Sequence, residues 1–221
     1  MIRAVLFDVD FTLARPGPEL RPEGYVSCGA RYGLDLDEAR YEDARDAAFV
    51  DLQRHPELDH DEEIWVAFTE RIVLGMGGAL PEAHDVAVEL TSRWAQHTNF
   101  ELYDDTLPTL HRLRAQGVKL GLVSNSARDV REFAVHHRLD IDAGISSFHH
   151  GKAKPHASIF RAVLDLLEVE PHEALMVGDS VDDDIEGAQA AGMHAVLLDR
   201  LGLHPEFAPR IGSLAELRLS G

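Results

Sequence analysis

The chain has 221 residues, of which 45% are hydrophobic and 27% are charged, and these are ordinary values for a folded globular protein. Its length suits one large α/β domain or a core domain with a smaller second one. No stretch approaches the roughly 18 consecutive apolar residues of a membrane helix, and Asp8 and Asp10 interrupt the opening apolar run before it resembles an export signal. We therefore expect a cytoplasmic protein that does not enter membranes.

The chain carries 39 acidic and 21 basic residues, a formal net charge of −18. A surface of this charge repels nucleic acid and anionic membranes, which excludes both as expected partners. It also repels a small anionic substrate, so a phosphate site would need local cations such as Lys152 and Lys154. The single cysteine, Cys28, cannot form an internal disulfide, in keeping with a reducing cytoplasm, and we expect it to be packed within a helix.

Short apolar runs alternate with helix-length segments along most of the chain. The runs predict strands at residues 2–7, 118–123, 174–177 and 195–198, with a weaker one at 143–148. The helical segments lie at about 105–116, 127–138, 156–168 and 183–191. This alternation is typical of βα units around a parallel sheet, and it predicts an α/β fold with a doubly wound, Rossmann-like core.

A long segment separates the first predicted strand from the second. Its helical patterns lie near residues 37–53, 62–75 and 82–97. Asp37 and Asp61 are suitable N-caps, and the glycines at 75–78 mark a break between two helices. We therefore expect a catalytic α/β core formed by residues 1–14 and 101–221, with an inserted α-helical cap domain formed by residues 15–100.

Polar groups follow the predicted strands at the points where ligands bind to open α/β sheets, beyond the carboxyl ends. They are Asp8 and Asp10 after the first strand, Ser124 and Asn125 after the second, Asp179 with Asp183 and Asp184 after the fourth, and Lys154 before an intervening helix. Asp8 and Asp10 repel each other, and a divalent cation between Asp8 and the Asp179 cluster would relieve that repulsion. Oxygen ligands of this kind favour Mg²⁺ over Zn²⁺.

Each of these features, taken alone, also has an ordinary structural interpretation. A lone Asp-x-Asp pair usually solvates the end of a strand, and the acidic run up to Asp184 could complement a helix dipole. Ser124 and Asn125 lie at a strand-to-helix turn that could bind an anion, although a serine N-cap is the more common role. Lys154 could be an exposed charge, with Pro155 as the first residue of a helix.

The four features together, in this order, resemble the haloacid dehalogenase superfamily, chiefly its phosphatases with an inserted helical cap. The matching motifs are Asp8-Val9-Asp10-Phe11-Thr12-Leu13, Leu122-Val123-Ser124-Asn125, Lys154-Pro155, and Gly178 through Asp184 followed by Gly187-Ala188 and Ala191-Gly192. Two residues depart from the family pattern. Phe11 stands where many members have glycine, and His156 stands where an aspartate often follows Lys-Pro. Both flank the motifs, so they bear on substrate and rate more than on the class of reaction.

The resemblance implies a Mg²⁺-dependent phosphatase that hydrolyses a small phosphorylated metabolite, a phosphomonoester, through an aspartyl-phosphate. Asp8 would be the nucleophile and Asp10 the general acid and base. Thr12, Ser124, Asn125 and Lys154 would hold the phosphoryl oxygens, and Mg²⁺ would be bound by Asp8, Asp10 and Asp179, supported by Asp183 or Asp184.

Two other functions share this core and stay open. A phosphosugar mutase would return the phosphoryl group to a sugar, and a phospho-accepting regulatory module would not turn over. A halide-removing relative is disfavoured because such relatives generally have tyrosine at the position of Asp10.

Overall fold

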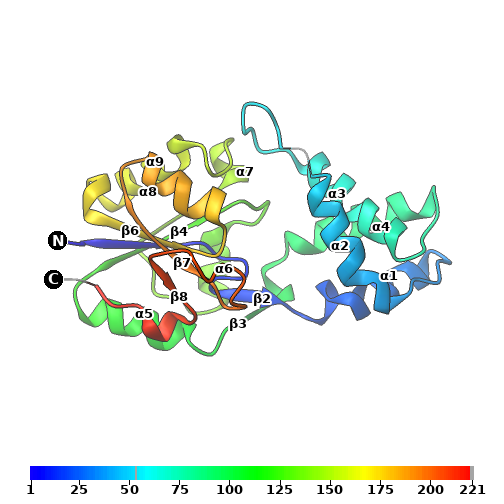
Figure 1. Cartoon of the computed structure of the whole chain (residues 1–221), viewed down its shortest axis with the longest axis horizontal. Helices are drawn as coiled ribbons and strands as arrows, with labels where there is room; N and C mark the ends of the chain where they lie inside the picture. The colour runs from blue at the N-terminus through cyan, green and yellow to red at the C-terminus, as the bar shows by residue number, and fades with distance from the viewer. Residues whose placement is uncertain (53, 220–221) are drawn as a thin grey trace. The chain divides into compact units, whose positions relative to one another are not determined.

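A computed structural model describes residues 1–52 and 54–219 (Figure 1). The chain divides into two compact units, one formed by Met1–Arg15 with Glu101–Gly221 and the other by Pro16–Phe100. Arg15, expected in the inserted segment, belongs to the first unit. Across the described ranges, no helix is long and apolar enough to cross a membrane.

A parallel sheet forms the centre of the first unit. In the described part of the chain its strand order is β5-β4-β1-β6-β7-β8. The bounds are β1 Ala4–Phe7, β4 Lys119–Ser124, β5 Ala143–Ser146, β6 Ala174–Gly178, β7 His194–Leu198 and β8 Arg210–Ile211. Phe7 of β1 lies opposite Leu122 of β4 and Val177 of β6, and both pairings are parallel. The carboxyl ends of β4, β1 and β6 are therefore neighbours at one edge of the sheet.

Helices cover both faces of this sheet (Figure 1). They are α5 Thr106–Ala115, α6 Val130–His136, α7 Ser147–His150, α8 Ala157–Leu167 and α9 Gly187–Ala190. Figure 1 shows α8 and α9 on one side of the sheet and α5 on the other. The buried residues of α8 recur at helical spacing, and Ile159 and Val163 pack in one cluster with Leu6 of β1. The predicted doubly wound α/β core is confirmed.

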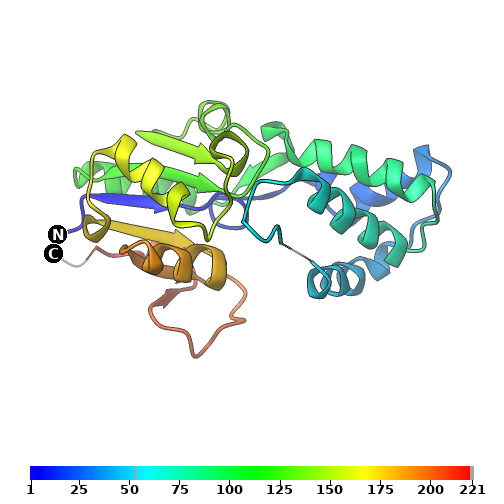
Figure 2. The same ribbon diagram turned by 90° about the horizontal axis from the view of Figure 1, so that it is seen from above.

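The second unit is helical (Figure 2). Its helices are α1 Pro22–Arg31, α2 Tyr41–Val50, α3 Glu62–Gly75 and α4 Glu82–Trp94, and α3 packs against both α2 and α4. Their buried faces share one apolar cluster that includes Tyr25, Ile72 and Leu90. The Asp61 side chain accepts a hydrogen bond from the backbone N–H of Glu63, so its prediction as the N-cap of α3 is confirmed.

Shorter elements complete the two units. β2 Ala14–Pro16 and β3 Phe100–Leu102 form a separate two-stranded sheet. Single helical turns lie at Pro18–Leu20, Glu38–Arg40, His97–Asn99, Pro171–Glu173 and Leu214–Glu216. Asp37, predicted as the N-cap of the helix near 37–53, caps the second of these turns, directly before α2, by accepting from the N–H of Ala39. Residue 53, the last of the helix expected near 37–53, lies outside the described residues.

The structure corrects three local predictions. Pro155 is not the first residue of a helix, because α8 begins at Ala157 and the ring of His156 caps it by accepting from the N–H of Ser158. The helix expected at 183–191 is a π-helical turn over Val181–Glu186 followed by the short helix α9. No bounds were predicted for helix α1, although a helix was expected around Cys28, because its two glycines lower its helix propensity. It contains Cys28, which is buried in a helix as expected.

Candidate active site

Lys154 lies between two carboxylates at the carboxyl edge of the sheet. Its ammonium group is 2.6 Å from an oxygen of Asp8, directly after β1, and 2.6 Å from an oxygen of Asp184 in the π-helical turn. All three residues are buried. Burial opposes the charge of Lys154, but the carboxylates of Asp184 and Asp8 outweigh it and raise the pKa of Lys154 above its ordinary value. The lysine is therefore a buried cation, and the interpretation of Lys154 as an exposed charge is wrong.

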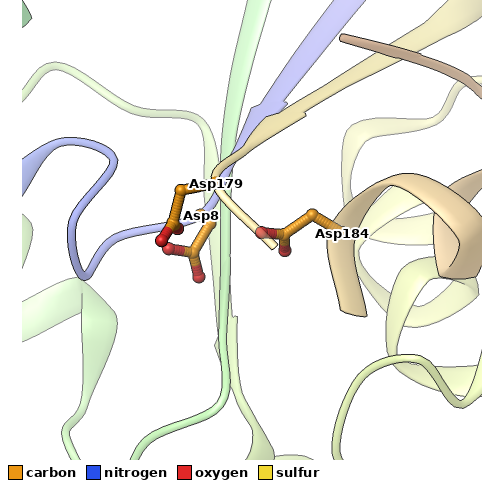
Figure 3. Close-up of side chains that lie close together, drawn as sticks. All are labelled: Asp8, Asp179 and Asp184. Carbon is orange, nitrogen blue, oxygen red and sulfur yellow. The ribbon is translucent and has the colours of Figure 1, made fainter. Parts of the chain in front are cut away.

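Asp8, Asp179 and Asp184 form a cluster of carboxylates (Figure 3). Each offers one oxygen, and these oxygens all lie within 4.8 Å of one another. Burial is the main cause that raises the pKa of Asp179 to about 7 and the pKa of Asp8 well above its ordinary value, and the neighbouring Asp184 raises both further. The cluster contains only hard oxygen donors, and it has more negative charge than Lys154 alone balances. These donors fit a divalent cation such as Mg²⁺.

Asp184, rather than Asp183, is the deeply buried member of the acidic run. The backbone N–H of Ser180 donates to its carboxylate at 3.1 Å. Gly178, at the end of β6, makes room for it, because a Cβ at that position would collide with the Asp184 side chain. Asp183 is only partly buried, and its carboxylate accepts a hydrogen bond from the amide nitrogen of Asn125 at 3.5 Å.

The predicted phosphate-binding residues take different positions around this cluster. The hydroxyl of Thr12 is buried and donates to Asp179 at 3.2 Å. Ser124 is buried at the end of β4, and its hydroxyl lies 3.3 Å from that of Ser126. Ser124 does not cap the following helix, because Asp129 fills that position in α6. Two hydroxyls and one ammonium group are thus close to the carboxyl ends of β1, β4 and β6.

The side chain of Asn125 holds the backbone of Lys154. Its amide nitrogen donates to the Lys154 carbonyl at 3.0 Å, and its amide oxygen accepts from the Lys154 N–H at 2.7 Å. The two bonds fix the loop that carries the buried lysine. Sequence considerations suggested only that the Asn125 backbone binds an anion, and nothing in its spacing indicated this contact.

Asp8 and Asp10 diverge after the end of β1. Whereas Asp8 is paired with Lys154, both carboxylate oxygens of Asp10 accept hydrogen bonds from the guanidinium group of Arg128. The Arg128 side chain is 1% exposed and that of Asp10 is 20% exposed. Sequence reasoning missed Arg128, because spacing alone does not distinguish a buried arginine from an exposed one.

Arg200 is a second residue that sequence reasoning missed. One of its nitrogens donates to the carbonyl of Thr12 at 2.9 Å, and its guanidinium group pairs with Asp105. The guanidinium carbon also lies 3.9 Å from the centre of the Tyr103 ring. Arg200 therefore ties the loop that follows Asp8 to the start of α5.

The two departures from the family pattern have different local consequences. Phe11 has a φ of 61°, a left-handed conformation that favours glycine, and its side chain is half-exposed. His156 uses its ring nitrogen as the N-cap of α8, a role for which aspartate is also well suited. The second substitution therefore keeps the cap of the helix that follows Lys154.

The chain is similar to known hydrolases and phosphatases in sequence and in fold. A family model described as haloacid dehalogenase-like hydrolase matches residues 2–192. A glyceraldehyde 3-phosphate phosphatase from Methanopyrus kandleri is 33% identical over 225 residues, which cover 95% of this chain and 89% of that protein. A phosphoserine phosphatase from Thermus thermophilus is 28% identical, with 99% of each chain covered. The crystal structure of a phosphatase from Thermococcus onnurineus has a TM-score of 0.67 and 31% identity, covering 98% of this chain and 96% of that one.

Proposed function

The chain belongs to the haloacid dehalogenase-like hydrolase family, and from that premise we propose that it is a Mg²⁺-dependent phosphatase that hydrolyses a small phosphomonoester through an aspartyl-phosphate on Asp8. The observation that carries the proposal is the buried Asp8 carboxylate, 2.6 Å from Lys154 and clustered with two further carboxylates. The relatives named for glyceraldehyde 3-phosphate and phosphoserine support a small phosphorylated metabolite as the class of substrate.

In the first half of the proposed reaction, a carboxylate oxygen of Asp8 attacks phosphorus. The bond between phosphorus and the ester oxygen breaks as the new bond to Asp8 forms. Asp10, two residues further along the same loop, gives its proton to the departing alkoxide. In the second half, Asp10 takes a proton from water as that water attacks the phosphorus, and inorganic phosphate leaves while the Asp8 carboxylate is restored.

Lys154 supplies positive charge at the site of attack. Its ammonium group is already paired with Asp8, so it is placed to contact a phosphoryl oxygen that approaches that carboxylate. Thr12, Ser124 and the backbone N–H of Asn125 are proposed to donate to the remaining oxygens. These donors are needed because the chain as a whole repels anions.

Mg²⁺ would be held by the carboxylates of Asp8 and Asp179 and by the backbone carbonyl of Asp10. Asp184 would support the site through its bond to Lys154, and Asp183 through its contact with Asn125. The bound cation would offset negative charge on the carboxylates and on the phosphoryl group. The raised pKa values of Asp8 and Asp179 support this assignment, because a bound cation would offset the burial that disfavours their ionised forms.

The proposal is tested with Asp8→Asn and 4-nitrophenyl phosphate. Loss of a nucleophile normally costs several orders of magnitude in kcat, so the variant should retain less than about 1% of the wild-type rate. Asp182→Asn is the matched control, because Asp182 is an exposed member of the same acidic run. Retention of a tenth or more of the rate by Asp8→Asn would contradict the covalent role.

The same assays separate the two related functions. A mutase would interconvert isomers of its sugar phosphate and release little free phosphate. A regulatory module would take up one phosphoryl group per chain and show no multiple turnover, even in the wild type. Asp10→Asn provides a further test, because with an aryl phosphate this variant should form the phosphoenzyme and hydrolyse it slowly, giving a burst roughly stoichiometric with enzyme.

A further inference from the structure

Arg128 is a buried charge whose guanidinium group contacts the Asp10 carboxylate of the proposed site. It lies in the loop between β4 and α6, and it is among the largest fully buried side chains of the described residues. One of its terminal nitrogens donates to both oxygens of Asp10. The guanidinium carbon lies 5.7 Å from the centre of the Phe133 ring in α6. The guanidinium group is therefore held between a helix and the loop that follows Asp8.

Burying a guanidinium group has a large desolvation cost, which an apolar side chain of similar size would avoid. Arginine remains charged at all physiological pH values, and its planar group fixes the direction of its hydrogen bonds. A carboxylate bound head-on by one nitrogen keeps one further lone pair on each oxygen. The contact with Arg128 thus holds both oxygens of the Asp10 carboxylate at one place, and it leaves a lone pair on each oxygen able to exchange a proton with a substrate or with water.

We infer that Arg128 is a positioning residue that holds the Asp10 carboxylate for its two proton transfers, first to the leaving alkoxide and then from the attacking water. This inference rests on the proposed function, in which Asp10 is the general acid and base. Arg128 itself gives up no proton. Its contribution is to fix the orientation of a carboxylate that is 20% exposed and lies in a loop.

A purely structural role makes a different prediction. If Arg128 only stabilised the fold, Arg128→Met would lower the melting temperature and leave the activity of the folded fraction unchanged for every substrate. If Arg128 acts through Asp10, its loss should weaken protonation of the leaving group, so the damage should grow as the leaving group becomes poorer.

The experiment compares kcat/KM for phenyl phosphate and 4-nitrophenyl phosphate, because both are aryl phosphates and the first has the poorer leaving group. The variants are Arg128→Met, Asp10→Asn and the double variant, with folding checked by circular dichroism. Arg114→Met is the matched control, since it removes a guanidinium group that pairs with Asp140 and Asp142 elsewhere in the same unit.

We expect Arg128→Met to lower kcat/KM about a hundredfold for phenyl phosphate and about tenfold or less for 4-nitrophenyl phosphate. The double variant should be no worse than Asp10→Asn, because residues that act as one unit do not have additive effects. Arg128→Lys, which keeps a cation, should retain more activity on phenyl phosphate than Arg128→Met. Added guanidinium at millimolar concentration should partly restore Arg128→Ala, and it should not restore Arg128→Ala combined with Asp10→Asn.

The outcomes distinguish failure of the inference from failure of the proposed function. If Asp10→Asn leaves both substrates unaffected, the acid and base role of Asp10 fails, and the inference fails with it. If Asp10→Asn is impaired while Arg128→Met has equal losses on both substrates, or the two losses add in the double variant, only the role of Arg128 is overturned. If Arg128→Met does not fold, Arg128→Lys and guanidinium-treated Arg128→Ala replace it. Their losses of kcat/KM on phenyl phosphate and 4-nitrophenyl phosphate are then compared in the same way.

Discussion

The Lys154 ammonium and the Asp8 carboxylate are 146 residues apart in the chain and 2.6 Å apart in the structure. Because the ammonium group also contacts Asp184, one cation is shared by two buried carboxylates. Removing it would leave both carboxylates without their main compensation, in surroundings that disfavour charge.

Lys154→Met should therefore destabilise the protein strongly. Breaking a buried ion pair from one side costs about 3–5 kcal/mol in the free energy of unfolding, which urea denaturation measures. Mg²⁺ should recover part of this loss by binding the same carboxylates. Lys119→Met is the control, because the partly exposed Lys119 donates to the carbonyl of Leu167 away from the site, and we expect it to cost less than about 1 kcal/mol. Equal losses of stability in Lys154→Met and Lys119→Met would contradict the role of Lys154 as the cation shared by the two carboxylates.

Without a divalent cation, the stability of the folded protein should fall as the pH rises toward the pKa of Asp179 in the folded state. Its pKa is about 7 in the folded protein against about 3.9 in the unfolded chain, so between these values the folded state holds the extra proton. Raising the pH removes that proton and leaves the folded state with an unfavourable charge.

The same proton competes with a cation for the Asp179 carboxylate. The increase in melting temperature caused by Mg²⁺ should therefore be larger at pH 8 than at pH 5.5. Thermal unfolding in chelator and in Mg²⁺ at several pH values measures this difference. Asp179→Asn, which cannot ionise, should show a flatter dependence in chelator, and an unchanged dependence would show that another group is responsible.

Gly178→Ala should disrupt the site from the end of β6. The added Cβ would collide with the Asp184 carboxyl group and displace it from Lys154 and from the N–H of Ser180. We expect a loss of about 2 kcal/mol in stability, comparable to overpacking in a core, together with weaker Mg²⁺ binding by calorimetry. Gly121→Ala in β4 is the control, because its Cβ would meet only side-chain atoms of Leu167, Leu6 and Val163, and Mg²⁺ binding should be unchanged.

The backbone conformation at residue 11 should favour glycine over phenylalanine. At a φ of 61°, alanine has the steric conflict of any Cβ and glycine does not, so Phe11→Gly should be more stable than Phe11→Ala by about 1 kcal/mol. Chemical denaturation of the two variants gives the comparison. Val135, an exposed residue of α6, is the reverse control. Val135→Gly should be about 1 kcal/mol less stable than Val135→Ala. If the glycine variant is the less stable one at both positions, backbone strain at Phe11 is excluded.

The fold was largely predictable because buried parallel strands are continuous apolar runs. Residues 4–7 are all buried, and the predicted strands fall within a few residues of those observed. The extent of helix α1 around Cys28 was not predicted, because packing of Tyr25 and Cys28 into the helical unit outweighs its weak propensity. The π-helical turn after Ser180 was also not predicted, and within it Asp184 lies against Gly178, a contact between residues six apart that no hydrophobic pattern indicates.

The site was predictable only at the level of which strand ends meet. Parallel order brings Asp8, Ser124 and Asp179 to one edge, and apolar runs followed by polar residues indicate this directly. The partners of those residues could not be predicted. Arg128 and Arg200 act through contacts between distant segments, and an arginine that binds a carboxylate has the same sequence pattern as one that faces water.

The two hydrogen bonds between the Asn125 side chain and the Lys154 backbone match those that a facing residue makes in a hydrogen-bonded pair of an antiparallel ladder. Asn125 thus supplies a peptide-like group from a side chain, next to Pro155, which has no N–H of its own to offer. Aspartate at this position would lack the donor, and glutamine would carry the same amide one methylene further out. Substitutions at residue 125 should then destabilise the protein because no other side chain has an amide group of this reach. The loss of stability should be the same in a variant that no longer turns over substrate.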